Sequence, residues 1–145
     1  MGATTSRRKI LVYSDDSTVR AAILGALGNR VSADLPEHDI SEFATADGLR
    51  AVVDASKSGS AADLIILDAE AVPEGGMGVS RQLKDEVFQC PPILLITARP
   101  DDAWLAAWSR ADATVLGPID PFTFATVVAE LLRTPAASHA HSASH

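Results

Sequence analysis

Three polar side chains follow short apolar runs of this chain, and their types suit metal and phosphoryl chemistry. Asp15 comes after the first run, Asp68 after the second and Thr97 after the third. Two neighbouring carboxylates repel each other unless they share a proton or hold a cation, and oxygen ligands favour a hard ion such as Mg²⁺. A carboxylate beside such an ion can attack a phosphoryl group, and a threonine hydroxyl can donate to a phosphoryl oxygen. The pattern predicts an acidic, hydroxyl-bearing pocket, provided the fold brings these residues together.

The apolar runs have the pattern of strands that are covered on both faces of a parallel sheet. They cover residues 10–13, 64–67, 93–96 and 114–116. Ligands of such sheets bind just beyond the carboxyl ends of the strands, so we expect the three polar residues to meet at that edge. The fourth run ends at Gly117, which has no side chain and leaves a gap in the expected pocket.

Helical patterns alternate with strand patterns along the chain. Strands are predicted at 9–13, 39–44, 63–67, 93–96 and 113–116, of which 39–44 has the alternating pattern of an edge strand. Helices are predicted at 17–27, with Asp16 or Ser17 as its cap, and at 47–56, 79–87, 101–111 and 122–133. Strict alternation predicts βαβ units with right-handed crossovers and a parallel sheet, which is an α/β fold.

Length and composition narrow the class of protein. The 145 residues, 47% of them hydrophobic, suit one domain at 9–133, with a flexible N-terminus at 1–8 and a disordered tail at 134–145. A net charge of −7 and the lack of a long basic run argue against a nucleic-acid partner. The apolar stretches are too short for a membrane span. The single Cys90 cannot form an internal disulfide, which predicts a cytoplasmic location.

Taken in order, the motifs resemble the receiver domain of bacterial two-component response regulators. The resemblance covers residues 9–133 and rests on the stretch 10–20, the strand 63–68, Pro73 with the glycines that follow it, the pair 97–98, and the segment 111–122. It implies a flavodoxin-like, doubly wound (βα)5 fold with a five-stranded parallel sheet in the order 2-1-3-4-5.

The resemblance also implies roles for particular residues. Asp68 matches the phosphoacceptor of the family, and Thr97 matches the hydroxyl that takes part in its conformational switch. The implied cofactor is Mg²⁺, held by the side chains of Asp15 and Asp68 and by the backbone carbonyl of Glu70. The implied partner is a sensor histidine kinase or another signalling protein.

Three positions depart from the pattern of the family, and each removes part of its chemistry. Ser14 stands where the first of two acidic residues is expected. Mg²⁺ should therefore bind weakly or not at all, with Ser14, or Asp16 after a shift of register, reaching it through a water. Gly117 replaces the lysine that holds a phosphoryl oxygen, and Thr114 replaces the aromatic ring that rotates with the switch hydroxyl.

These departures predict an atypical, single-domain response regulator that signals through protein–protein contacts, with Asp68 as a vestigial or slow phosphoacceptor. It would not be an enzyme beyond slow self-phosphorylation and dephosphorylation at Asp68. Glu74 is near enough to Asp68 in sequence to influence phosphate hydrolysis. Two alternatives stay open. One is a working Mg²⁺-dependent phosphoacceptor in a phosphorelay fed by a histidine kinase. The other is a small-molecule sensor that uses the pocket opened by Gly117.

A second copy of the chain is a further candidate partner. Trp104 and Trp108 are four residues apart and share a face of the predicted helix 101–111. This face either partly covers the sheet or, with the strand 113–116 and the helix 122–133, forms a contact for a partner or for a second copy in a homodimer, because aromatic residues concentrate at interfaces.

Overall fold

The computed structural model describes residues 7–56, 62–99 and 103–133. Most of the predicted flexible N-terminus, at 1–6, and the whole predicted tail, at 134–145, lie outside these residues. The predicted start of the fourth helix, at 101 and 102, lies outside them as well.

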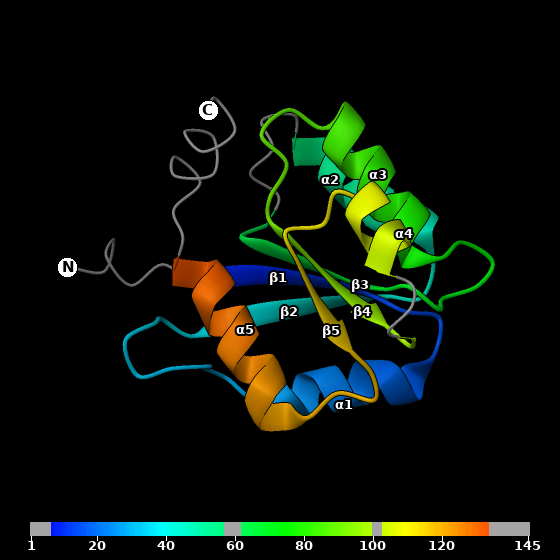
Figure 1. Ribbon diagram of the computed structural model, residues 1–145. Coiled ribbons are helices and arrows are strands. Elements are labelled where there is room, and N and C mark those ends of the chain that lie inside the picture. The colour runs from blue at the N-terminus through cyan, green and yellow to red at the C-terminus, as the bar shows by residue number, and fades with distance from the viewer. Residues whose placement is uncertain (1–6, 57–61, 100–102, 134–145) are drawn as a thin grey trace.

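Within the described residues, five parallel strands form one sheet in the order β2-β1-β3-β4-β5 (Figure 1). The strands are β1 (Arg8–Tyr13), β2 (His38–Phe43), β3 (Leu64–Asp68), β4 (Ile93–Thr97) and β5 (Ala113–Leu116). Both the fold class and the strand order confirm the flavodoxin-like α/β prediction, and β2 lies at an edge as its alternating pattern indicates.

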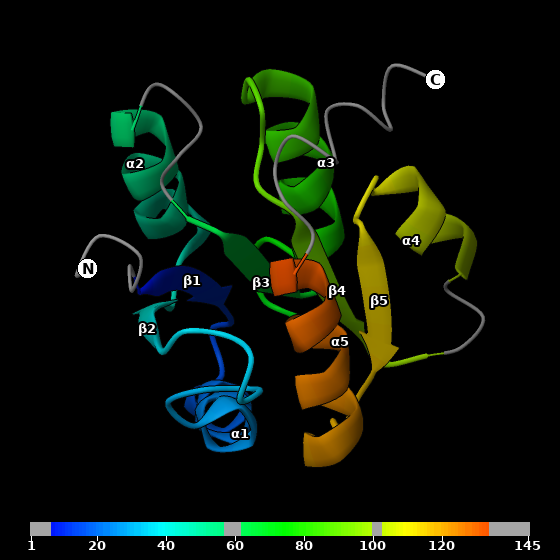
Figure 2. The ribbon, with the colours of Figure 1, turned by 90° about the vertical axis from the view of Figure 1, so that its left-hand side faces the viewer.

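Five helices join the strands, and they cover both faces of the sheet. They are α1 (Ser17–Leu27), α2 (Ala46–Ser56), α3 (Gly76–Glu86), α4 (Ala103–Trp108) and α5 (Pro121–Arg133). Helices α1 and α5 lie on one face, whereas α2, α3 and α4 lie on the other (Figure 2). None of the helices in the described segments is both long and apolar enough to cross a membrane.

The pleat of the central strands divides the core into two clusters. Ile10 and Val12 of β1 pack with residues of α1 and α5, whereas Leu11 and Tyr13 pack with residues of α2 and α3. The same alternation runs along β3 and β4. Successive side chains of a strand point to opposite faces of the sheet. Alternate residues along each strand therefore belong to different core clusters.

The beginning of β1 differs from the prediction of a flexible segment through residue 8. The Arg7 guanidinium pairs with Glu37 at 2.6 Å and with Asp39 at 2.9 Å, and the Arg8 amide donates to the Glu37 carbonyl at 3.0 Å. These contacts with the start of β2 extend the sheet by one residue. They join residues about 30 positions apart, so local sequence could not indicate them.

Helix α3 begins at Gly76, whereas the sequence predicts a start at Val79. Glycine disfavours a helix by about 1 kcal/mol relative to alanine, so the glycines at 75, 76 and 78 indicated a loop in the sequence analysis. A Cβ atom at Gly76 would lie 2.7 Å from the Asp68 carbonyl oxygen. Glycine therefore allows α3 to start directly against the end of β3.

The two tryptophans of α4 lie largely at the surface. The Trp104 side chain is 70% exposed and Trp108 is 46% exposed. The Arg81 guanidinium of α3 lies 5.3 Å from the centre of the Trp108 ring and donates to the Trp108 carbonyl at 3.0 Å. The interpretation that the rings partly cover the sheet is not supported for Trp104, which is mostly exposed. The Trp108 ring is about half buried and lies against Arg81 of α3.

We expect Ile66→Ala to lower the free energy of unfolding by about 2–5 kcal/mol, because it leaves a cavity in the fully buried middle of β3. Urea unfolding followed by circular dichroism measures this loss. Val52→Ala is the control, since Val52 is exposed on α2, and its effect should stay within about 0.5 kcal/mol. Equal losses in the two variants would contradict the assignment of Ile66 to the core.

Candidate functional site

Ser14 and Asp68 meet at the carboxyl ends of the two neighbouring central strands. Tyr13 of β1 pairs with Leu67 of β3, so the residues that follow them, Ser14 and Asp68, lie side by side. The Ser14 hydroxyl is fully buried and donates to Asp68 Oδ2 at 2.7 Å. The residue that replaces the expected first acid is therefore in direct contact with the predicted phosphoacceptor.

The second oxygen of the Asp68 carboxylate is also bonded by the protein. Asp68 Oδ1 accepts from the backbone amide of Glu70 at 2.8 Å, and the side chain is only 6% exposed. Burying a charged group is costly unless it is hydrogen-bonded, and these two donors reduce that cost. Both donors are neutral, so the negative charge of the carboxylate remains at the strand end.

Asp15 and Asp16 take different roles at the same strand end. Asp15 Oδ1 accepts from the Val72 amide at 3.0 Å, which ties this end of β1 to the loop after β3. Asp16 Oδ1 accepts from the Thr18 amide at 2.8 Å and caps α1, as the sequence predicts. With Asp16 engaged as a helix cap, Ser14 rather than Asp16 contacts Asp68.

Thr97 and Gly117 complete the site at the ends of β4 and β5. The Thr97 hydroxyl is buried and makes a long hydrogen bond of 3.5 Å to the Val115 carbonyl. The Gly117 amide donates to the Thr97 carbonyl at 2.7 Å. A Cβ atom at Gly117 would lie 3.3 Å from Ile96 Cγ2 and 3.6 Å from the Thr97 carbonyl oxygen. A side chain is therefore crowded there but not blocked by backbone.

A cavity of about 420 Å³ opens beside these residues. Its polar lining consists of Asp15, Asp16, Thr18, Asp68, Glu70 and Thr97, and its apolar lining includes Val19, Ala22, Val72, Ile96, Pro118 and Ile119. Among the residues that the structure describes, none of those lining the cavity is basic. The predicted pocket is thus present, and it is lined by both acidic and apolar side chains.

The donor set fits a magnesium ion only in a limited way. Asp15 and Asp68 line one cavity with Glu70, and Mg²⁺ can be held by one or two carboxylates with several waters. However, the described segments contain no group of three or more His, Cys, Asp or Glu side chains arranged for a metal. In addition, the neutral Ser14 hydroxyl contacts Asp68 Oδ2 where the family resemblance implies a second carboxylate. The residues present therefore fit a weak site that depends on water ligands.

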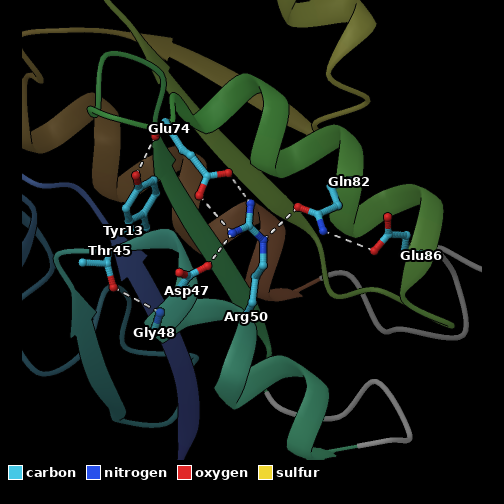
Figure 3. Close-up of polar contacts among 8 residues, drawn as sticks. All are labelled: Tyr13, Thr45, Asp47, Gly48, Arg50, Glu74, Gln82 and Glu86. Carbon is cyan, nitrogen blue, oxygen red and sulfur yellow. Dashed lines mark hydrogen bonds and ion pairs between the residues drawn. The ribbon is translucent and has the colours of Figure 1, made fainter.

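Glu74 lies in a network that the sequence analysis missed (Figure 3). Both of its carboxylate oxygens bond the Arg50 guanidinium of α2, one of them at 2.9 Å. These hydrogen bonds hold the pKa of the Glu74 carboxyl below its usual value. Glu74 is not among the residues that line the cavity. The hypothesis that it influences phosphate hydrolysis therefore has no geometric support.

The same network holds the loop between β3 and α3. The Tyr13 hydroxyl donates to the Glu74 carbonyl at 2.5 Å, and burial raises the pKa of this hydroxyl, which keeps it a donor. Arg50 also donates to Gln82 of α3 at 2.8 Å and to Asp47 at 3.0 Å. Among these contacts of Arg50, the pair with Asp47 has a helical spacing that a sequence can reveal, whereas those with Glu74 and Gln82 do not. The network positions the loop that carries Glu70.

We expect Ser14→Ala to lower the free energy of unfolding by about 1.5–3 kcal/mol at neutral pH, because it removes a donor to a buried carboxylate. Ser14→Asp should destabilise the apo protein through repulsion with Asp68, and Mg²⁺ should recover more stability in this variant than in the wild type. Urea unfolding with and without MgCl₂ measures both effects. Ser41→Ala on the exposed edge strand is the control. If Mg²⁺ left the free energy of unfolding of Ser14→Asp unchanged, the contact between residue 14 and Asp68 would be contradicted.

Comparisons with known proteins agree with this fold. No family model matches the chain. Response regulatory proteins of two Mycobacterium tuberculosis strains, CDC 1551 and H37Rv, are each 48% identical to it over 136 residues, which cover 94% of this chain and 99% of each relative.

Solved structures with similar folds are receiver domains. The signal receiver domain of a Luxo repressor protein from Vibrio parahaemolyticus has a TM-score of 0.73 and 20% identity over 97% of this chain and 100% of its own. A CheY-like response regulator receiver domain from Methanospirillum hungatei has a TM-score of 0.66 and 19% identity, over 88% of this chain and 94% of its own. These structures show the fold, and the mycobacterial relatives show the family. The chain belongs to the response regulatory proteins, and its fold is that of their receiver domain.

Proposed function

We propose that this response regulator receiver is an atypical one, in which Asp68 accepts phosphate slowly and the signal passes through protein–protein contacts. The observation that supports this most directly is the Ser14 hydroxyl bonded to Asp68 Oδ2 at 2.7 Å, in a cavity whose described lining has no basic side chain. The partner would be a histidine kinase or another signalling protein. The cytoplasmic location and the lack of enzymatic turnover remain predictions.

The electrostatics of the cavity oppose fast phosphoryl transfer. In that step a carboxylate oxygen of Asp68 would form a bond to phosphorus while the bond to the leaving group of the donor breaks. The incoming phosphoryl group is anionic, and four acidic side chains, including Asp68, line the cavity. Catalysis of such transfers depends largely on cations that neutralise the phosphoryl oxygens. Bound Mg²⁺, held by Asp15 and Asp68, would supply part of that charge, and Gly117 supplies none.

The hydrogen bonds of Asp68 also weaken its nucleophilicity. Each carboxylate oxygen already accepts from the protein, Oδ2 from Ser14 and Oδ1 from Glu70. A hydrogen bond to the attacking oxygen stabilises the charged ground state and must be lengthened or exchanged as the new bond forms. This supports slow labelling rather than complete loss of the reaction.

Exposed apolar side chains on α4, β5 and α5 support a role in protein contacts. Trp104 of α4, Leu116 of β5 and Phe122 of α5 are all more than half exposed, Phe122 reaching 81%. Large apolar side chains left at the surface often mark interaction sites, and aromatic residues are enriched in interfaces. We therefore propose this surface, defined by Trp104, Trp108, Leu116 and Phe122, as the contact for a partner or for a second copy of the chain.

We expect acetyl phosphate to label Asp68 slowly in the wild type and about 10²-fold faster in the double variant Ser14→Asp/Gly117→Lys, which restores an acid and a cation. Intact-protein mass spectrometry over time, with Mg²⁺ present, measures the rate. Asp68→Asn should abolish labelling. Gly78→Lys, at an open position of α3, is the control for an added lysine and should label like the wild type. Rapid, stable labelling of the wild type would refute the proposal.

If the Trp104 surface joins two copies, sedimentation velocity should show mass increasing with concentration in the wild type. Trp104→Ser should weaken this association, because it removes a large exposed aromatic from the surface. Phe88→Ser is the matched control, since Phe88 is 75% exposed but follows α3. A wild type that stays monomeric, or a Phe88 variant that loses association equally, would remove the homodimer from the proposal.

A further inference from the structure

We propose that the cavity beside Asp68 binds a small organic ammonium ion with an aliphatic body. The cavity belongs to the site described above, but this inference does not require phosphorylation. It rests on the size of the cavity, the sign of its charge, its apolar wall and the absent side chain at Gly117.

The cavity has the size of a small-molecule site. Its volume is about 420 Å³, and sites for small ligands range over roughly 300–1,000 Å³. Its walls come from four regions of the fold, namely the junction of β1 with α1, the end of β3 with the loop after it, the end of β4 and the segment that follows β5. The network of Tyr13, Arg50 and Glu74 holds the loop after β3, so this wall is preformed.

The charge of the cavity selects a cation. Asp15, Asp16, Asp68 and Glu70 line it, and no basic residue does so within the described part of the chain. The Arg20 guanidinium of α1 approaches the same strand end, but it donates to the Ser14 carbonyl at 2.6 Å and pairs with Glu42 at 3.1 Å. The donors on Asp68 are neutral. A cation of the ligand would therefore be attracted by the acidic side chains that line the cavity, whereas an anion would be repelled.

The apolar lining distinguishes an organic cation from an inorganic one. Val19 and Ala22 of α1 face the same cavity as Ile96, Pro118 and Ile119. A metal ion would use only the acidic side chains and leave the apolar ones in contact with water. An alkyl chain would cover the apolar side chains and remove their surface from water. The acidic and apolar lining together match an ammonium head group on a short aliphatic chain.

Gly117 lines the cavity next to Ile96 and Thr97 and offers a way to test the inference. A Cβ atom there would lie 3.3 Å from Ile96 Cγ2, so a side chain at this position requires a small shift of the Ile96 side chain. A lysine at this position would carry its own ammonium on an alkyl chain into the space that the ligand is proposed to fill. Gly117→Lys should therefore act as an internal competitor.

The experiment titrates n-butylammonium chloride into the full chain, with no phosphodonor and no Mg²⁺, and follows backbone amides by NMR. We expect saturable shifts at cavity residues such as Val19, Thr97 and Ile119, together with a rise in unfolding temperature. Butan-1-ol tests the apolar body without the charge, sodium butyrate tests the opposite charge, and sodium chloride tests ionic strength. None of these three should give the same saturable shifts.

Gly117→Lys should weaken butylammonium binding by more than about tenfold, because a second cation in the cavity repels the first. Gly78→Lys on α3 adds the same charge away from the cavity and should leave the affinity unchanged. Asp15→Asn should weaken binding severalfold, and the unfolding temperature of each variant without amine shows whether it folds. Unchanged affinity in Gly117→Lys, or equal shifts with butan-1-ol, would overturn the inference. The titration contains no phosphodonor, so a negative result would leave the proposed slow phosphorylation of Asp68 untouched. Likewise, a failure of the phosphorylation proposal would leave the ammonium inference untouched.

Discussion

A buried carboxylate at the end of a central strand must be satisfied by hydrogen bonds, and the site of this protein is organised around that requirement at Asp68. The side chain lies where β1, β3 and β4 end, and only 6% of it reaches solvent. Ser14 and the Glu70 amide supply the two donors. Because burying an unpaired charge costs far more than burying a bonded one, these donors let the strand end on an acid, although none of the described residues that line the cavity is basic.

Neutral donors lower the cost of burial, but they leave the charge in place. Asp68 and its acidic neighbours therefore make a cavity with negative potential, and its apolar wall limits how far water can screen that potential. A phosphoryl group enters such a cavity against repulsion, whereas a cation enters it with attraction. Gly117 in place of a lysine bears on both proposals, because the cavity gains no positive charge there. Ser14 in place of an acid bears only on the slow phosphoacceptor, since it removes one negative charge from the site.

The scaffold holds this geometry through contacts remote from Asp68. The two core clusters fix β1 and β3 side by side, and the Arg50 network fixes the loop that follows β3 (Figure 3). Gly76 brings the first turn of α3 against the Asp68 carbonyl, closer than any other residue type would allow. The site can therefore keep its shape even though its electrostatics differ from those that the family resemblance implies.

Local patterns in the sequence determined the fold class, the strand ends and most helix bounds. Buried parallel strands must be apolar throughout. The side-chain types narrowed the cap of α1 to Asp16 or Ser17, and the structure shows that it is Asp16. Tertiary structure decided which residue contacts Asp68, where α3 begins and what Glu74 does. Ser14 and Asp68 are 54 positions apart, and Arg50 and Glu74 are 24 apart. Such contacts depend on strand register and on the packing of helices against the sheet, which no local pattern of residues encodes.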